Sequence, residues 1–344
     1  MKAVVMARPA YGAFEWRDVP VPEPGPRDVL VKVQVAAICG SDIHVYRWSE
    51  WAQGANIPVP YIAGHEFCGE VVAVGSQVTA VKPGDRVAGE THIPCGQCYQ
   101  CRTGLQHICH NERIFGIHTN GCFAEYTLLP EPCAVKVMDG VRADEAALLE
   151  PMGGPFRAAV LLDPLGSSLF LQGCGPIGLF GIAIARLAGA ATIISSDVSD
   201  YRLELAKKMG ADVLLNPKRD DVAAAVRELT GGLGVDGVAD FSGNVPAIEQ
   251  IFGLARHGGK AVLFGVPDGP VKIDAAGKVI LSEVNVQGLH GRKMYETWYK
   301  TQRLLAVGRL DVSPVITHRM PMADAVKAME LAVSGQAGKI LLYP

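Results

Sequence analysis

One glycine-rich loop, Gly173 to Gly178, constrains the fold of this 344-residue chain more than any other stretch. It has the pattern G-x-G-x-x-G, follows the apolar run Ser168 to Gln172, and precedes a helical pattern from Leu179 to Ala188. Glycines allow a tight turn and a close approach of the backbone to a phosphate, so the motif in this strand-loop-helix context indicates a dinucleotide site. The cofactor contacts predicted here are Gly173, Gly175, Pro176, Ile177 and Gly178.

The next strand, Ala191 to Ser196, ends at an acidic residue. Asp197 lies nineteen residues beyond Gly178, where a carboxylate can hydrogen-bond both hydroxyls of an adenosine ribose and would repel a 2′-phosphate. NAD is therefore favoured over NADP. Arg202 is a further candidate contact and weakens this preference a little, because an arginine there could accept a phosphate; stacking on adenine or facing solvent is the alternative.

Strands and helices continue to alternate over this half of the chain. Further helices are predicted at Tyr201 to Met209 and Val222 to Leu229, and further strands at Val213 to Asn216, Gly237 to Asp240, Lys260 to Gly265 and Val284 to Gly288. Six strands in this order predict an α/β fold with a doubly wound parallel sheet. A membrane span over Leu169 to Ala185 is the weaker interpretation, because five glycine or proline residues interrupt it and Arg186 follows.

The first part of the chain has a different pattern, with short β-rich runs between turns. Strands are predicted at Lys2 to Met6, Asp28 to Val35, Gly69 to Val74 and Asp85 to Ala88. They predict a mostly antiparallel, barrel-like domain over residues 1–153, followed by the dinucleotide-binding domain over 154–292. Beyond Arg292 we expect one amphipathic helix, Met322 to Ser334, and a strand, Lys339 to Leu342, so that residues 293–344 return to the first domain.

Four cysteines lie close together in the first part. Cys95, Cys98, Cys101 and Cys109 have the spacing C-x2-C-x2-C-x7-C, which can close on one tetrahedral zinc ion. A site with four thiolates has no position for a substrate, so it would be structural. An iron–sulfur cluster is the alternative, although its usual run has a shorter third gap followed by a proline. Free buried thiols are the simplest alternative.

A second group of potential metal ligands is spread along the chain. Cys39, His65 and Glu150 supply a thiolate, an imidazole and a carboxylate, and Glu66 is adjacent to His65. This set suits zinc and leaves one coordination position open, which is typical of a catalytic site. A histidine considered alone is more often a surface or core residue than a ligand.

The composition is that of a soluble α/β protein. The net charge is −3, and 19% of the residues are charged, so neither a nucleic acid nor an anionic membrane is an expected partner. The apolar part of the N-terminus is too short for a signal peptide, and the nine cysteines have metal-binding spacing, so a cytoplasmic location is expected.

These features together resemble those of the zinc-dependent medium-chain dehydrogenases, over the whole chain. The resemblance rests on Cys39-Gly40-Ser41-Asp42, Gly64-His65-Glu66, the four cysteines, Gly84-Asp85-Arg86-Val87 and the glycine loop. Within the family the chain is most similar to the L-threonine 3-dehydrogenases. That narrower resemblance rests on residues 46–53, 89–93, 197–206, 291–300 and 313–318.

The resemblance implies a fold, two metal sites and a reaction. It implies a GroES-like catalytic domain carrying a structural zinc lobe, beside a Rossmann domain. Cys39, His65 and Glu150 would hold the catalytic zinc, with Glu66 as an exchangeable or neighbouring ligand, and the four cysteines would hold a second zinc ion. A secondary alcohol, most closely L-threonine, would be oxidised to 2-amino-3-oxobutanoate with NAD as the hydride acceptor. A homotetramer or homodimer is also implied.

Ser41 and His44 would carry the alcohol proton to solvent. Ser41 replaces a threonine that is usual in the family and keeps the hydroxyl group. We expect the site to lie between the two domains, because the glycine loop and the metal ligands belong to different ones. His92 and Arg292 are candidates for the substrate pocket, although each could be a packing residue.

One segment departs from the threonine enzymes. After Glu150 they usually have Gly-Asn-Ala and a histidine, whereas this chain has Gly153-Gly154-Pro155-Phe156-Arg157. Arg157 could bind a substrate carboxylate or a cofactor phosphate, or it could be a salt-bridged helix residue. The departure leaves a polyol, sugar or amino-sugar dehydrogenase as an alternative, and a non-catalytic zinc protein as an alternative of another class.

Overall fold

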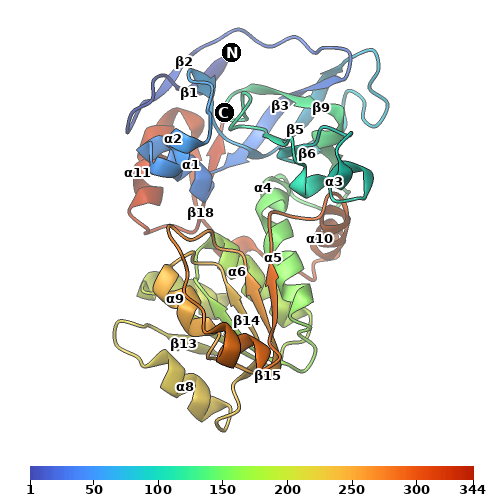
Figure 1. Ribbon diagram of the computed structural model, residues 1–344. Coiled ribbons are helices and arrows are strands. Elements are labelled where there is room, and N and C mark those ends of the chain that lie inside the picture. Colours follow the sequence, from blue (N-terminus) through green and yellow to red (C-terminus); the bar gives the residue numbers. More distant parts are fainter. The chain divides into compact units, whose positions relative to one another are not determined.

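The computed structural model describes residues 1–344 and divides the chain into two compact units (Figure 1). The first unit consists of Met1–Pro151, Lys293–Val307 and Ile316–Pro344. The second consists of Met152–Arg292 and Gly308–Val315. The segment after Arg292 is therefore shared, since eight of its residues, 308–315, belong to the second unit.

The second unit is built on one six-stranded sheet, in which every neighbouring pair is parallel. The spatial order is β13-β12-β11-β14-β15-β16, so the order reverses between β11 and β14. The strands are β11 (Ser168–Gln172), β12 (Thr192–Ser196), β13 (Val213–Leu215), β14 (Val235–Asp240), β15 (Ala255–Leu263) and β16 (Asn285–Gly288). The prediction of a doubly wound parallel sheet is confirmed. In such sheets, ligands bind outside the carboxyl ends of the strands at the reversal.

Helices connect these strands. They are α6 (Pro176–Leu187), α7 (Asp200–Lys208), α8 (Val222–Leu229) and α9 (Val245–Ile251), with a π-helical turn at Ala276–Ile280. The core contains Phe170, Ile194, Val238 and Ala261, one from each of four neighbouring strands, and all four side chains are fully buried. A parallel sheet covered on both faces needs near-continuous apolar strands, and for this reason the strand predictions were accurate here. No helix of the structure has the length and apolarity needed to cross a bilayer.

The first unit is mainly antiparallel. Its larger sheet has the order β10-β6-β5-β3-β18-β17, with β9 also paired to β3, and its smaller sheet has the order β2-β1-β4. The strands of the larger sheet are β3 (Asp28–Ala37), β5 (Glu66–Val74), β6 (Arg86–Gly89), β9 (Tyr126–Pro130), β10 (Ala134–Lys136), β17 (Ile316–Pro321) and β18 (Lys339–Tyr343). Those of the smaller sheet are β1 (Lys2–Met6), β2 (Phe14–Asp18) and β4 (Tyr61–Ile62), and β7 (His92–Ile93) pairs with β8 (Arg113–Ile114).

Short helices surround these sheets. They are α1 (Gly40–Arg47), α2 (Glu50–Gly54), α3 (Tyr99–Arg102), α4 (Ala143–Ala147), α10 (Glu296–Ala306) and α11 (Ala325–Val333), while α5 (Leu149–Leu161) continues into the second unit. The prediction of a single helix beyond Arg292 was wrong, because α10 precedes α11. Four of the five residues that α10 buries are Thr297, Trp298, Thr301 and Gln302. A buried face with so many polar groups does not give the apolar period that marks a helix.

Candidate functional site

Cys39 is held at the start of α1 by the helix's own capping. It is the N-cap residue, and its backbone N–H donates to Asp42 Oδ2 over 2.9 Å. An acidic residue in the first turn also interacts favourably with the helix dipole. The capping therefore fixes the backbone that carries the Cys39 thiol.

His65 is positioned by the glycine before it. Gly64 has φ +88°, and a Cβ atom there would lie 2.2 Å from Phe123 Cδ1, so only glycine fits. The buried imidazole has Ser41 Oγ 3.5 Å from its Nε2 and Asp42 Oδ1 3.5 Å from its Nδ1. Burial lowers the pKa of His65, but the charges of Asp42 and Cys39 outweigh it and hold the pKa well above the ordinary value.

Glu66 meets a buried lysine from the far end of the sequence. Lys339 Nζ donates to both carboxylate oxygens over 2.5 Å and to Ile38 O over 3.0 Å. Both side chains are almost completely buried. Burial is the largest influence on the pKa of Lys339 and lowers it, but the charges of Glu66, Cys39 and Glu150 and the hydrogen bond to Glu66 together raise that pKa, so the ammonium form is retained. The pair therefore fixes the orientation of Glu66.

Three of the four predicted catalytic-zinc ligands form one cluster. The ligand atoms of Cys39, His65 and Glu66 all lie within 4.8 Å of one another, and Glu150 is not in that set. Glu150 Oε1 instead accepts a hydrogen bond of 2.8 Å from Thr91 Oγ1, and its charge helps to raise the pKa of Glu66, for which burial is the largest cause. A thiolate, an imidazole and carboxylates in one buried cluster have the donor chemistry that fits zinc.

The two predicted relay residues lie on one helix. Ser41 and His44 are three residues apart in α1 and therefore share a face. Ser41 is half-buried near His65, and the exposed His44 has its Nδ1 3.1 Å from Ser49 Oγ. No direct hydrogen bond joins Ser41 to His44, so a proton passing between them needs another group or a water molecule.

His92, predicted to line the substrate pocket, is held by a carboxylate. Glu90 is fully buried, and its Oε1 lies 2.6 Å from His92 Nδ1 and accepts a 2.9 Å bond from the His92 N–H. Its other oxygen, Oε2, accepts a bond of 2.7 Å from the indole N–H of Trp298, in α10. Glu90 thus fixes the orientation of the imidazole, and Trp298, from a segment distant in sequence, fixes Glu90.

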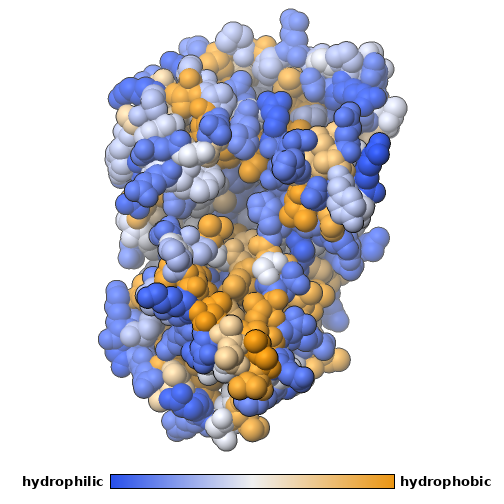
Figure 2. All heavy atoms as spheres, viewed as in Figure 1, coloured by the Kyte–Doolittle hydropathy of each residue, from blue (hydrophilic) through white to orange (hydrophobic).

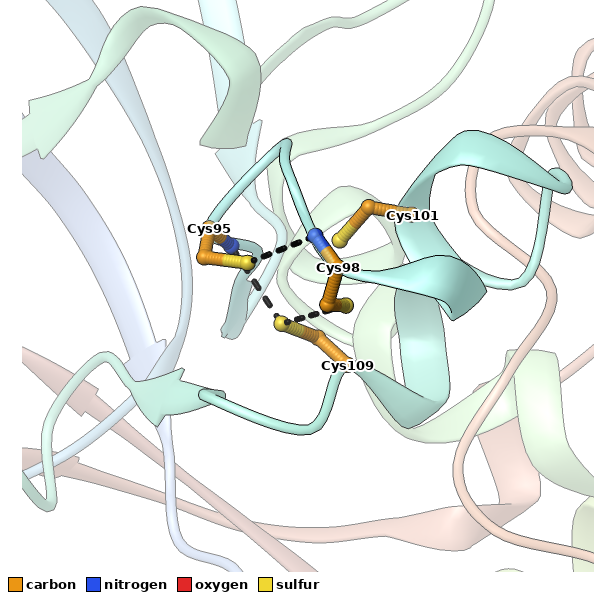
Figure 3. Close-up of side chains that lie close together, drawn as sticks. All are labelled: Cys95, Cys98, Cys101 and Cys109. Atoms are coloured by element: carbon orange, nitrogen blue, oxygen red, sulfur yellow. Dashed lines mark hydrogen bonds between the residues drawn. The ribbon is translucent and has the colours of Figure 1, made fainter.

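The four cysteines predicted to hold the second metal ion do come together (Figure 3). Their sulfur atoms face a common point and lie within 4.8 Å of one another, with Cys98 Sγ and Cys109 Sγ 3.7 Å apart. Hydrogen bonds from the N–H groups of Gln97 and Cys98 lower the pKa of Cys95 to about 6, whereas burial raises that of Cys101 to about 12. Four sulfurs around one point fit a tetrahedral zinc ion.

The glycine loop of the second unit forms a cradle. Gly173 has φ +86°, and a Cβ atom at Gly178 would lie 1.8 Å from Gly173 O, so the helix and the loop can approach only because residue 178 has no side chain. Helix α6 begins at Pro176, and its N-cap, Gly175, makes no side-chain cap. The first-turn N–H groups, among them that of Ile177, fit a phosphate.

Asp197 follows β12 at the same edge of the sheet. Its Oδ2 accepts a bond of 2.8 Å from the Cys174 N–H, and its Oδ1 accepts one of 2.9 Å from the Ser199 N–H. Each carboxylate oxygen has a second lone pair, which can accept a ribose hydroxyl. Arg202 Nη1 lies 3.9 Å from Asp197 Oδ2, and its Nε is buried without a hydrogen bond.

The departing segment in α5 is shaped by its neighbours in the second unit. A Cβ atom at Gly153 would lie 2.5 Å from Arg292 Cβ, and one at Gly154 would lie 2.4 Å from Phe264 Cε2. Arg292 is buried, and Arg157 Nη1 donates to His290 O over 3.1 Å. The two glycines therefore make room for the side chains of Arg292 and Phe264.

Comparisons with known proteins agree with this geometry. The model described as "Alcohol dehydrogenase GroES-like domain" matches residues 25–139, and that described as "Zinc-binding dehydrogenase" matches residues 176–306. An L-threonine 3-dehydrogenase of Symbiobacterium thermophilum is 44% identical over 329 residues, which cover 95% of this chain and 93% of that protein. This chain belongs to the zinc-binding dehydrogenases. The resemblance inferred from the motifs is thereby confirmed.

Solved structures of dehydrogenases share the whole fold. A protein from Sinorhizobium meliloti 1021, bound to NADP, is 33% identical with a TM-score of 0.90, and the match covers 100% of this chain and 99% of that one. An alcohol dehydrogenase of Escherichia coli CFT073, complexed with NADH, is 27% identical with a TM-score of 0.89 and the same coverage. The chain is therefore an oxidoreductase that acts on a small molecule.

Sequence reasoning missed several residues of the zinc-binding dehydrogenase site. Lys339, Asp42 and Glu90 were not singled out, although each contacts a predicted site residue. Two of them had a signal: Asp42 stands three residues after Cys39, as in a capping box, and Lys339 is a lysine that opens an otherwise apolar strand. Nothing in the sequence indicated the contact between Glu90 and Trp298.

Proposed function

We propose that this chain oxidises the secondary hydroxyl of L-threonine to 2-amino-3-oxobutanoate, with NAD as the acceptor. The observation that carries the proposal is the convergence of Cys39, His65 and Glu66 in a chain whose second unit has a dinucleotide-binding fold. The Symbiobacterium thermophilum relative supports the choice of substrate. A non-catalytic zinc protein has no need for both an incompletely filled ligand set and a dinucleotide-binding glycine loop in one chain.

The proposal assigns a task to each group of residues. Cys39, His65 and Glu150 would hold the catalytic zinc, with Glu66 as an exchangeable ligand steadied by Lys339. Zinc, when bound, supplies Lewis-acid chemistry, and NAD supplies the hydride acceptor. Cys95, Cys98, Cys101 and Cys109 would hold the structural zinc.

The remaining tasks fall to the chain's own polar groups. Ser41 would accept the hydroxyl proton and His44 would pass it to solvent, and the capping of α1 supports this by fixing the helix that carries both. The first turn of α6 would bind the pyrophosphate and Asp197 the ribose hydroxyls. Because Asp197 would repel a 2′-phosphate, NAD is preferred to NADP.

Threonine differs from a simple alcohol in its carboxylate, and Arg292 is the proposed partner of that group. We expect Arg292→Ala to raise the KM for L-threonine by about 10- to 100-fold, because a charge-assisted hydrogen bond contributes roughly 1.5–3 kcal/mol. The KM for NAD should stay within about twofold. Initial rates of NADH formation with L-threonine measure both.

A substrate without the carboxylate supplies the control for that experiment. With 1-amino-2-propanol the Arg292→Ala variant and the parent should give the same KM. An equal loss with both substrates would mean that Arg292 has only a packing role.

A polyol or amino-sugar dehydrogenase is the second candidate, favoured by the departure at Gly153 to Arg157. It would keep every metal and cofactor residue and differ only in the pocket. Turnover of a polyol, sugar or amino-sugar panel without turnover of any 2-amino-3-hydroxy acid would replace the threonine assignment.

Oligomerisation is proposed through one edge of the second unit. Strand β16 is an edge strand with all four residues exposed, and apolar side chains gather on this face of the unit, near the Ala276–Ile280 turn (Figure 2). Leu281, which directly follows this turn, is 77% exposed, and Val266, three residues after the end of β15, is 80% exposed. Exposed apolar side chains beside an open sheet edge are typical of an interface between copies.

A charge at this edge tests the proposal. We expect Leu281→Asp to lower the oligomer mass from that of a homotetramer, or of a homodimer, because a buried unpaired carboxylate destabilises an interface. Light scattering during gel filtration measures the mass. Lys300→Asp, on the exposed face of α10, is the control and should not change it. An unchanged mass for Leu281→Asp would place any interface elsewhere.

We also propose a cytoplasmic location. All nine cysteines are free: five belong to the candidate metal clusters, and the other four are buried. Fractionation of cells that express the chain tests this location.

A further inference from the structure

A fully buried carboxylate lies where β14 ends. Asp240 is the last residue of that strand, and its side chain accepts four hydrogen bonds. Oδ1 accepts from Gln172 Nε2 over 3.2 Å, from the Ser242 N–H over 3.2 Å and from Ser242 Oγ over 2.6 Å. Oδ2 accepts from the Gly243 N–H over 2.9 Å. All four donors are uncharged, so the carboxylate organises the turn that follows β14.

The same carboxylate joins this turn to the end of β11. Gln172 is the last residue of β11 and stands directly opposite Asp240 in the parallel pair. Besides the side-chain bond, the Phe241 N–H donates to Gln172 O over 2.8 Å. The two strands meet where the sheet order reverses, so Asp240 ties together the two chain segments that border the expected ligand position.

Backbone contacts carry this arrangement to the glycine loop. A Cβ atom on Gly173 would lie 2.8 Å from Ser242 N and 3.0 Å from Ser242 Cα, so the loop rests directly on the Asp240 turn. Gly173 O in turn packs against Gly178 in α6. On the other side of the turn, a Cβ atom on Gly265 would lie 2.2 Å from Gly243 N and 2.6 Å from Asp240 Oδ2. Because no side chain lies between the glycine loop and this turn, a movement of the turn would be passed directly to the loop.

We infer that Asp240 is a positioning residue for the dinucleotide. Through the turn at Ser242 it fixes the position of Gly173, and Gly173 in turn fixes the position of the first-turn N–H groups of α6, which would bind the pyrophosphate. The inference rests on the proposed NAD site and assigns Asp240 no contact with the cofactor. Burial raises the pKa of Asp240, so a carboxylate is costly here. An acceptor-only group is nevertheless required, because all four partners donate.

Asp240→Asn tests the inference with little change in volume. The asparagine side chain must present its NH2 group either to the donors of Gln172 and Ser242 or to the Gly243 N–H. In both orientations one hydrogen-bond donor faces another, so the turn has to move. We expect the Kd for NADH, measured by nucleotide fluorescence, and the KM for NAD to rise about tenfold or more. The KM for the alcohol substrate and the zinc content should not change.

The same strand supplies a matched control. Asp236 also lies in β14, at the opposite end, where its side chain accepts bonds of 2.8 Å from Ser168 N and Oγ and one of 2.7 Å from Arg256 Nε. Asp236→Asn should lower the melting temperature, as Asp240→Asn does, and leave the Kd for NADH within twofold. Comparison of the two variants separates positioning of the cofactor from general loss of stability.

A milder variant covers the case in which Asp240→Asn does not fold. Ser242→Ala removes only the 2.6 Å bond that the hydroxyl donates to Asp240 and the bond that Ser242 Oγ accepts from the Asn244 N–H. We expect it to raise the Kd for NADH about threefold in a folded protein. An unchanged Kd in Ser242→Ala would contradict the inference.

These NADH-binding experiments distinguish failure of this inference from failure of the proposed function. If the parent protein binds no NADH, the cofactor assignment and this inference both fall. If the parent binds NADH and Asp240→Asn binds it equally well, only the inference falls. It also falls if Asp236→Asn and Asp240→Asn lose the same affinity, because that result describes stability and not positioning.

Discussion

Cys39→Ser should reduce oxidation of the alcohol substrate by at least about a thousandfold in kcat/KM, because a neutral hydroxyl replaces a metal-binding thiolate in a site that depends on its Lewis acid. Cys95, Cys98, Cys101 and Cys109 form a separate cluster, so the ion proposed for them should remain. Elemental analysis should therefore show zinc falling from about two ions per chain to about one. NADH formation with L-threonine measures the activity.

A second buried cysteine provides the control. Cys68 is fully buried in β5, has no disulfide partner and is not in either metal cluster. Like Cys39→Ser, Cys68→Ala removes one sulfur atom, but this variant should keep both ions and most of the activity. Full activity in Cys39→Ser would remove Cys39 from the catalytic site, whatever the zinc content.

Gly178→Val should raise the Kd for NADH by at least about a hundredfold. The added Cβ atom would lie 1.8 Å from Gly173 O, a backbone atom that cannot rotate away, so α6 must move from the end of β11 and its first turn leaves the phosphate position. Quenching of protein fluorescence by NADH measures the Kd. Zinc content should not change, since the four cysteines and Cys39 belong to the first unit.

The same helix supplies a graded comparison. A Cβ atom on Gly181 would lie 2.9 Å from the ring of Phe241 and at an ordinary contact distance, 3.7 Å, from Pro155 Cβ, and a ring can shift where a backbone carbonyl cannot. Gly181→Ala should therefore change the Kd by no more than about threefold. An equal loss of NADH affinity in the two variants would show that α6 tolerates no side chain at either position. The contact between Gly178 and Gly173 O would then not explain the effect of Gly178→Val.

The second unit could be predicted from local pattern alone. Most of its strands contain short apolar runs, with the exposed edge strand β16 as the exception, and each pairs with a neighbour in the parallel order that alternating strands and helices imply. The helix α10 could not be predicted in this way. Its buried face carries threonines and a glutamine, and Gln302 is buried because its side chain accepts the N–H of Met138. Partners so distant in sequence are not visible in a local window.

The same difference between local and distant contacts applies to the candidate site. Motifs identified residues whose chemistry is local, such as the four cysteines and the glycine loop. They did not identify the residues that support them. Lys339 and Trp298 lie 273 and 208 residues from the carboxylates that they contact, and neither has a spacing that marks it. Supporting residues need only a hydrogen-bond donor in the right position, and the fold supplies the position.

The pairing of β18 with β3 also sets an order of assembly during synthesis. Lys339 Nζ lies on the strand that reaches the sheet last, whereas Glu66 is made 273 residues earlier. At about 5–20 residues per second, ribosomes need roughly 15–55 seconds to cover that interval. Until then the carboxylate lacks its ammonium partner. Glu66 consequently reaches the orientation that Lys339 fixes only after almost all of these residues have been translated.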